Sequence, residues 1–244
     1  MVYSLTNNSQ KSFNRSINFV QVYRYFSNKN NRPSGPKYKK EYKDSLKLSS
    51  FLKEALIGLI LGDVYVSRPK AHYNTRLVFD QSKEKHSDYL NYLYELFEPF
   101  VGTEPKSTSR KPDKRTGLTY DSLIFKTLAF PCFNEYYELF YPNGKKIVPL
   151  NISEYLTEVS LAFWIMDDGG KTTYGDLLLH TNGYTFEEVQ LLVLVLKEKF
   201  NLVCKVSQRK PNQGAILIPK KELCKVRKLV SSYLHSSMEY KISE

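Results

Sequence analysis

The sequence predicts an α+β protein built from two pseudo-symmetric halves, each with the element order αββαββα. Two apolar stretches, residues 56–64 and 161–169, each carry an acid at the eighth position. These acids, Asp63 and Asp168, lie about 105 residues apart, a separation that suits one small structural unit. A similar series of helix and strand patterns follows each stretch, so we interpret the chain as a tandem repeat.

Composition favours a globular protein that binds a polyanion. The 244 residues, 41% of them hydrophobic, can bury a core. Lys and Arg number 36 against 25 acids, a net charge of +11, which favours nucleic acid or an anionic membrane surface. No apolar run approaches the roughly 20 residues that span a bilayer, so we expect nucleic acid and no membrane. Three widely spaced cysteines and four scattered histidines give neither a disulfide framework nor a zinc pattern.

The N-terminal residues 1–45 are predicted to form a flexible basic arm. Residues 1–40 contain eight Lys or Arg and no acid. Such a segment is typical of a mitochondrial transit peptide, and residues 24–27 resemble a processing site, but a disordered basic arm is the alternative. The two halves are then expected at 46–150 and 151–244.

In the first half, Ser49 or Ser50 can cap a helix that runs through the first apolar stretch to Asp63. Gly58 lies inside this helix at a cost of about 1 kcal/mol relative to Ala, which predicts that another backbone approaches closely there. The following patterns predict strands at 64–68 and 75–81, a helix at 84–97, two strands around the basic turn 110–117, and a helix at 132–141.

The second half repeats this order. Its signature helix ends at Asp168, and Thr185 caps a later helix that has Glu187 and Glu188 in its first turn. The remaining patterns predict strands around 172–174 and 177–181, a helix at 186–200, strands around 203–208 and 215–218, and a helix at 220–234.

The two apolar stretches resemble the signature of the LAGLIDADG homing endonucleases, in the two-motif single-chain type. Segments 39–43, 166–171 and 184–189 extend the resemblance to an intron-encoded member from yeast mitochondria, over residues 39 to the C-terminus. It implies two packed signature helices with a DNA-binding β-saddle around them. Phe163 and Trp164 stand where the first helix has Gly58, so this seam should be asymmetric.

The same resemblance implies a mitochondrial, monomeric enzyme that makes site-specific double-strand breaks in a long DNA target, the reaction of intron homing. The different sequences of the two halves imply an asymmetric target. Two alternatives stay open. One is an intron RNA maturase of the same fold, with intron RNA as its partner. The other is a nucleic-acid-binding module without catalytic activity.

Asp63 and Asp168 are the expected catalytic metal ligands. Hydrolysis of a phosphodiester needs an activated water and charge neutralisation, which Mg²⁺ or Mn²⁺ held by carboxylates provides. An Asp at a helix C-terminus opposes the helix dipole, and two such acids repel each other unless a cation lies between them. The alternative is that each acid is a solvated helix end. The resemblance implies the backbone carbonyls of Gly62 and Asp167 as further ligands, whereas the Asp167 side chain is expected to face solvent.

Lys146 and Lys241 resemble the paired active-site lysines of the family, which could polarise the attacking water or neutralise the phosphate. Lys145 competes with Lys146 for this assignment, and either lysine could instead be a solvated charge. Asp80 and His180 are weaker candidates, because polar residues on strands are common.

Basic and polar residues on the predicted hairpins are expected to contact DNA phosphates or base edges. Each could be an ordinary surface residue, so the prediction depends on their shared placement. They are Arg68, Lys70, Arg76, Arg110, Lys111, Lys114, Arg115, Lys171, Tyr174, Lys205, Gln208, Arg209 and Lys210.

Overall fold

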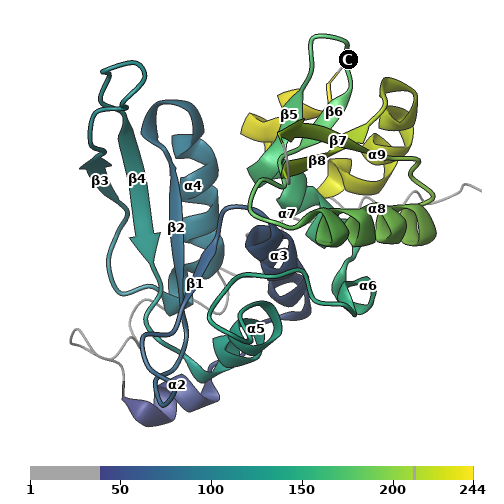
Figure 1. The fold of residues 1–244 in the computed structure, drawn as a ribbon. Helices are drawn as coiled ribbons and strands as arrows, with labels where there is room; N and C mark the ends of the chain where they lie inside the picture. Colours follow the sequence, from purple (N-terminus) through teal and green to yellow (C-terminus); the bar gives the residue numbers. More distant parts are fainter. Residues whose placement is uncertain (1–38, 211–212, 244) are drawn as a thin grey trace, which may run out of the picture. The chain divides into compact units, whose positions relative to one another are not determined.

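Two four-stranded antiparallel sheets flank a central pair of helices in the computed structural model, which describes residues 39–210 and 213–243 (Figure 1). The strand orders, β1-β2-β4-β3 and β5-β6-β8-β7, are equivalent in the two halves. The predicted α+β class and the predicted repeat are therefore confirmed.

The elements of the first half follow the predicted order. They are α2 (Lys40–Ser45), α3 (Ser50–Leu61), β1 (Tyr65–Ser67), β2 (Arg76–Ser82), α4 (Lys83–Phe97), η2 (Glu98–Phe100), β3 (Lys106–Ser109), β4 (Asp121–Lys126), η3 (Pro131–Phe133) and α5 (Asn134–Phe140). Helix α2 lies within the segment predicted to be a flexible arm, and Lys43 places its ammonium 5.8 Å from the ring centroid of Phe130. Residues 1–38 of that arm lie outside the described part of the chain.

The elements of the second half are α6 (Ile152–Tyr155), α7 (Glu158–Asp168), β5 (Gly169–Lys171), β6 (Leu177–Leu179), α8 (Phe186–Phe200), β7 (Lys205–Lys210), β8 (Gln213–Ile218), η4 (Lys220–Glu222), α9 (Leu223–Val230), η5 (Ser231–Tyr233) and η6 (Ser236–Lys241). The prediction of a strand around 172–174 was wrong, because β5 ends at Lys171. Residue Thr172 instead begins a turn, where Gly175 has a φ of 85° and donates its N–H to the Thr172 carbonyl.

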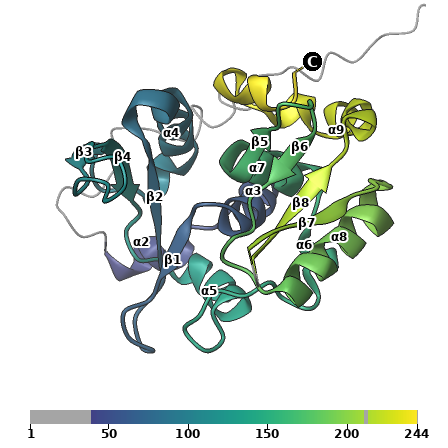
Figure 2. The same cartoon turned by 45° about the horizontal axis from the view of Figure 1, so that its top comes forward.

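Helices α3 and α7 lie side by side between the sheets (Figures 1 and 2). Ser49 caps α3 by accepting from the N–H of Leu52, as predicted. A Cβ added to Gly58 would lie 2.0 Å from the carbonyl oxygen of Ser160. The close backbone approach is therefore confirmed, and it joins the two halves at α3 and α7.

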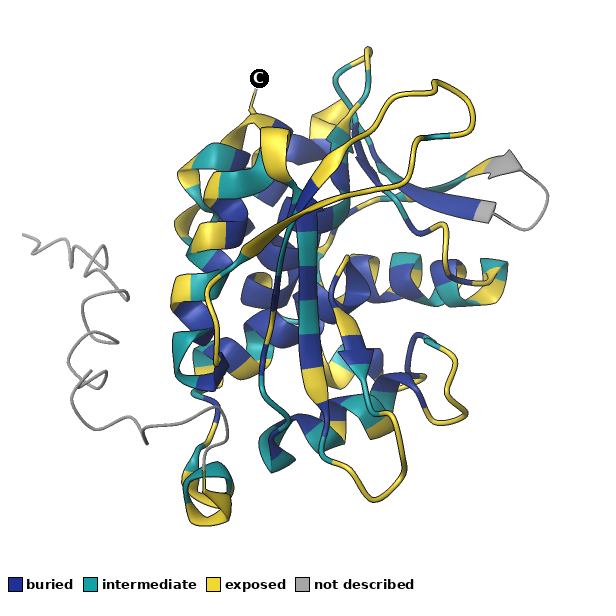
Figure 3. Cartoon of the chain, turned by 90° about the vertical axis from the view of Figure 1, so that its left-hand side faces the viewer, coloured by how far each residue is buried: buried dark blue, intermediate teal, exposed yellow. Residues whose placement is uncertain are grey.

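Helices α4 and α8 each cover one face of a sheet. Phe79 of β2 stacks on Phe125 of β4 with ring centroids 4.3 Å apart. The ring centroid of Phe97 of α4 lies 5.0 Å from that of Phe79. Val189 of α8 packs towards β8 at Gly214. Figure 3 shows buried residues gathered at the centre of the molecule and exposed ones mainly in loops and at its edge. Along β2, buried residues alternate with less buried ones. Each sheet therefore has a face that α4 or α8 does not cover, called the open face below.

Candidate active site

Asp63 and Asp168 lie at the C-terminal ends of the two central helices. Asp168 is the last residue of α7 and is partly buried, whereas Asp63 is exposed and follows the end of α3 by two residues. The side-chain amide of Gln81 donates to the Asp63 carboxylate over 3.1 Å, and Gln81 in turn bonds to His86 at 3.1 Å. Gln81 at the end of β2 was missed from the sequence, because its relation to Asp63 depends on strand pairing.

A lysine from the end of each half reaches the neighbouring helix end. The ammonium of Lys146 donates to the carbonyl of Gly62 over 2.8 Å. The ammonium of Lys241 donates to the carbonyls of Met166 and Asp167, the latter over 3.0 Å. Helix C-terminal carbonyls lack intrahelical donors and carry partial negative charge, so both contacts are favourable. Because Lys145 is exposed, the geometry favours Lys146 as the counterpart of Lys241.

The side chain of Asp167 is buried, so the expectation that it faces solvent was wrong. Its exposed fraction is 9%, and its carboxylate accepts from the hydroxyl of Tyr89 over 2.9 Å and from the backbone N–H of Asp63 over 3.1 Å. Gly62 makes room for it, since a Cβ there would lie 2.5 Å from Asp167 Cβ. Another tyrosine, Tyr184, donates its hydroxyl to the carbonyl of Leu61 over 2.9 Å.

Three carboxylates, those of Asp63, Asp167 and Asp168, repel one another at the site. Burial raises the pKa of Asp168 to about 7, helped by the charge of Asp63 and opposed by Lys146 and Lys241. Burial, together with the other two acids, holds the pKa of Asp167 well above its usual range. Burial lowers the pKa of both lysines, while the acids act in the opposite direction. A bound cation would relieve the repulsion among the carboxylates.

The donor atoms suit a hard divalent cation. Carboxylate oxygens of Asp63 and Asp168 and carbonyl oxygens of Gly62 and Asp167 are the ligand type that Mg²⁺ and Mn²⁺ prefer. Among the residues that the structure describes, no group of three or more His, Cys, Asp or Glu side chains could hold a metal. Water and phosphate oxygens would therefore complete the coordination, as is usual for Mg²⁺ at phosphate-processing sites.

The two weaker candidates, His180 and Asp80, lie in different places. The backbone N–H of His180 donates to the carbonyl of Asp168 over 3.1 Å, which places His180 beside the second acid. Asp80 forms an ion pair with Arg110 at 2.9 Å. Asp80 alternates along β2 with the buried residues Phe79 and Gln81, so it lies on the open face.

The first open face carries positive charge. Arg76 is exposed there, and strand pairing adds Lys106 and Lys126, which the sequence analysis did not select. The guanidinium of Arg68 bonds to Glu138 and to the carbonyls of Ala71 and Tyr73. The remaining predicted residues of this half, Lys70, Lys111, Lys114 and Arg115, are exposed.

In the second half, the pairing register of β7 and β8 places Lys205 and Gln208 on opposite faces of the sheet. Val206 lies against Gly214 on the face covered by α8, and alternation puts Gln208 on that same side. Lys205 points to the opposite, open face. Lys171 donates to the carbonyl of Ser243, and Tyr174 is 86% exposed. The side chains of Arg209 and Lys210 lie outside the described part of the chain.

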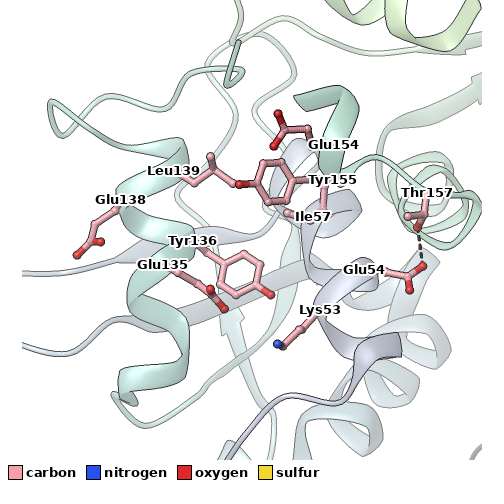
Figure 4. Close-up of a pocket in the computed structure, with 10 residues that line it drawn as sticks. All are labelled: Lys53, Glu54, Ile57, Glu135, Tyr136, Glu138, Leu139, Glu154, Tyr155 and Thr157. Carbon is pink, nitrogen blue, oxygen red and sulfur yellow. Dashed lines mark hydrogen bonds between the residues drawn. The ribbon is translucent and has the colours of Figure 1, made fainter. Parts of the chain in front are cut away.

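A cavity of about 520 Å³ lies elsewhere, and its lining does not include Asp63, Asp167 or Asp168. Figure 4 shows it lined by residues of α3, α5 and α6, with Tyr136 and Tyr155 in its wall. Glu54 accepts there from the hydroxyl of Thr157 over 2.7 Å.

None of the described helices is long and apolar enough to cross a membrane.

Two packed helices, each with an acid and a lysine at its C-terminal end, lie between two antiparallel sheets. The family model of the LAGLIDADG DNA endonuclease family matches residues 53–226. The chain belongs to this family, which confirms the resemblance seen in the sequence.

Named relatives agree with this assignment. The chain is 36% identical over 213 residues to "Probable intron-encoded endonuclease 1" of Wickerhamomyces canadensis, covering 84% of this chain and 88% of the relative. It is 32% identical over 201 residues to "Cytochrome b mRNA maturase bI2" of Debaryomyces hansenii, covering 80% and 74%. The structure of "The homing endonuclease I-WcaI bound to its DNA recognition sequence" matches with a TM-score of 0.78 and 35% identity, covering 86% of this chain and 94% of that one.

Proposed function

We propose that this protein is a metal-dependent homing endonuclease that cuts both strands of a long, asymmetric DNA site. The observation that carries the proposal is the placement of Asp63 and Asp168 at the ends of two contacting helices, each beside a lysine. The similar structure named for a homing endonuclease bound to its recognition sequence supports the same DNA-binding mode.

Asp63 and Asp168 would hold Mg²⁺ or Mn²⁺, with the carbonyls of Gly62 and Asp167 as further ligands. Such an ion supplies an activated water and neutralises charge on the phosphate. Lys146 and Lys241 contact those carbonyls and carry positive charge beside the acids. We assign to these lysines the stabilisation of negative charge as it develops on the phosphate.

One chain holds both acids and both lysines, so a monomer suffices for cleavage of two strands. The unequal open faces fit a target without two-fold symmetry. A relative named for cytochrome b mRNA supports a mitochondrial location. Light scattering would measure the oligomeric state. Fluorescence of a tagged full-length chain would show its location in the cell.

The test is to incubate the full-length protein and Mg²⁺ with a library of long DNA targets and to sequence the broken ends. Discrete cuts in both strands, lost on chelation with EDTA, are expected. Absence of cuts under conditions where the protein binds DNA would refute the proposal. The double variant Asp63→Asn/Asp168→Asn serves as the catalytic control.

An intron RNA maturase is the second candidate, because a relative with 32% identity is named as one. This activity would need the fold and its basic surfaces but not the metal site. The double acid variant therefore separates the two functions. If that variant still promotes splicing of an intron RNA while it no longer cuts DNA, the chain has both activities. If no intron RNA is bound or spliced, the maturase candidate fails.

A further inference from the structure

The two signature helices end differently. Helix α7 includes its acid, and Gly169 closes it by donating to the carbonyl of Ile165. Helix α3 ends at Leu61, and Gly62 leaves the helix with a φ of −85° and a ψ of −129°. The acid of α3 is therefore held by backbone that is not helical.

The N–H of Asp63 has no helical acceptor. The amide of Gly62 donates to the carbonyl of Gly58, and the amide of Val64 donates to the carbonyl of Leu59. The amide of Asp63, between them, donates instead to the carboxylate of Asp167 over 3.1 Å. A backbone N–H at the edge of a buried site needs such a partner, so this bond fixes where the chain leaves α3.

We infer that Asp167 is a positioning residue, which holds the backbone of Asp63 across the seam between the two halves. The inference rests on the proposed catalytic role of Asp63. A second hydrogen bond fixes the orientation of the Asp167 carboxylate. Its other oxygen, Oδ1, accepts from the hydroxyl of the fully buried Tyr89 over 2.9 Å. Gly62 lets the carboxylate approach, because any side chain there would collide with it.

This contact has no symmetric counterpart. Gly62 occupies in the first motif the position that Asp167 occupies in the second, and it has no side chain to donate or accept. Asp168 needs no such bond, because it remains within α7. A residue of the second half thus completes the catalytic site of the first half. Positioning errors near 1 Å can cost about 100-fold in rate.

The variants Asp167→Ala and Asp167→Asn distinguish this positioning role from a role of the negative charge of Asp167. The Ala variant removes both hydrogen bonds. The Asn variant preserves the bond to Asp63, because its amide oxygen can accept from Asp63 N–H, and it replaces the bond from the Tyr89 hydroxyl with one in which its NH₂ donates to the Tyr89 oxygen. At saturating DNA and Mg²⁺ we expect the cleavage rate of the Ala variant to fall roughly 10- to 100-fold. The Asn variant should stay within about threefold of the wild type, and both should bind DNA like the wild type.

A control and a second readout separate positioning from loss of stability. Leu192→Ala removes a fully buried side chain of α8, a helix that holds none of the proposed catalytic residues, and should retain the cleavage rate below its melting temperature. Hydrogen exchange of the Asp63 amide should be faster in the Ala variant than in the Asn variant, whether or not DNA is present. Wild-type cleavage is measured first, so its absence would count against the proposed function. Full cleavage by the Ala variant, equal losses in both variants, or unchanged exchange at Asp63 would overturn this inference.

Discussion

Lys241 bonds to two carbonyls at the end of α7, and a single side chain can serve there both as a helix cap and as a charge for catalysis. Its long aliphatic stem is buried, and its ammonium satisfies acceptors that the helix leaves open. Lys146 repeats the arrangement at Gly62. The two roles predict different outcomes when the charge is removed without removing the stem.

Lys241→Met keeps most of the stem and removes the charge. We expect the cleavage rate to fall by at least about 100-fold, because stabilisation of the transition state is lost. DNA affinity should change little, since the group contacts the helix end and not the open faces. Single-turnover cleavage and a binding titration measure the two effects. A lower melting temperature with an unchanged rate below it would show that Lys241 only caps the helix.

Sequence alone predicted the residues whose role depends on local pattern. The acid at the end of each apolar stretch and the serine cap before the first are properties of neighbouring residues. Gln81, Tyr89 and the buried carboxylate of Asp167 could not be found this way, because their partners are distant in sequence and are set by strand pairing or helix packing.

At the scale of elements, the α3–α7 pair determines the spacing of the acids. Both helices are apolar on nearly every side, as expected for helices buried between two layers. The predicted asymmetry of their seam is observed at Gly58, which contacts the backbone of Ser160 while the corresponding position carries Phe163. The early end of α3 was not predicted, because it depends on Gly62 and on contacts from the other half.

Gly58→Ala should destabilise the protein. Its Cβ would lie 2.0 Å from the Ser160 carbonyl, and since that atom belongs to a buried helix backbone, the helices must separate. We expect a loss of at least about 3 kcal/mol, which corresponds to a fall in melting temperature of roughly 6 °C or more. Gly183→Ala is the matched control, because nothing lies within 4 Å of the added Cβ. Equal melting temperatures for the two variants would contradict the close seam.

At the scale of the whole molecule, the open faces of the two sheets differ. The first carries Arg76, Lys106 and Lys126, whereas the second has Lys205 beside apolar strand residues. The sequence predicted basic hairpins but could not tell which residues share a face, since one residue of register reverses every side chain. Gln208 illustrates this, because it is exposed but lies on the side that α8 covers.

Lys126→Ala and Lys205→Ala should each weaken DNA binding and flatten its salt dependence, by about 0.9 log units for each phosphate that the lysine neutralises. Lys197→Ala is the matched control, because Lys197 is an exposed lysine of α8 away from the open face. Gln208→Ala should leave base preference unchanged in both half-sites. Profiling of cleavage over all single-base target variants measures this. Relaxed preference in one half-site would instead make Gln208 a base-reading residue.

The most direct test of the two-carboxylate site compares Asp63→Asn and Asp168→Asn with the wild type on a supercoiled plasmid that carries the mapped target. Each variant should lose double-strand cleavage while it binds DNA as well as the wild type, because each substitution removes a metal-ligand charge and leaves the sheets unchanged. Gel analysis of supercoiled, nicked and linear DNA, beside a binding titration, gives both quantities. Wild-type amounts of linear product from either variant would contradict the assignment.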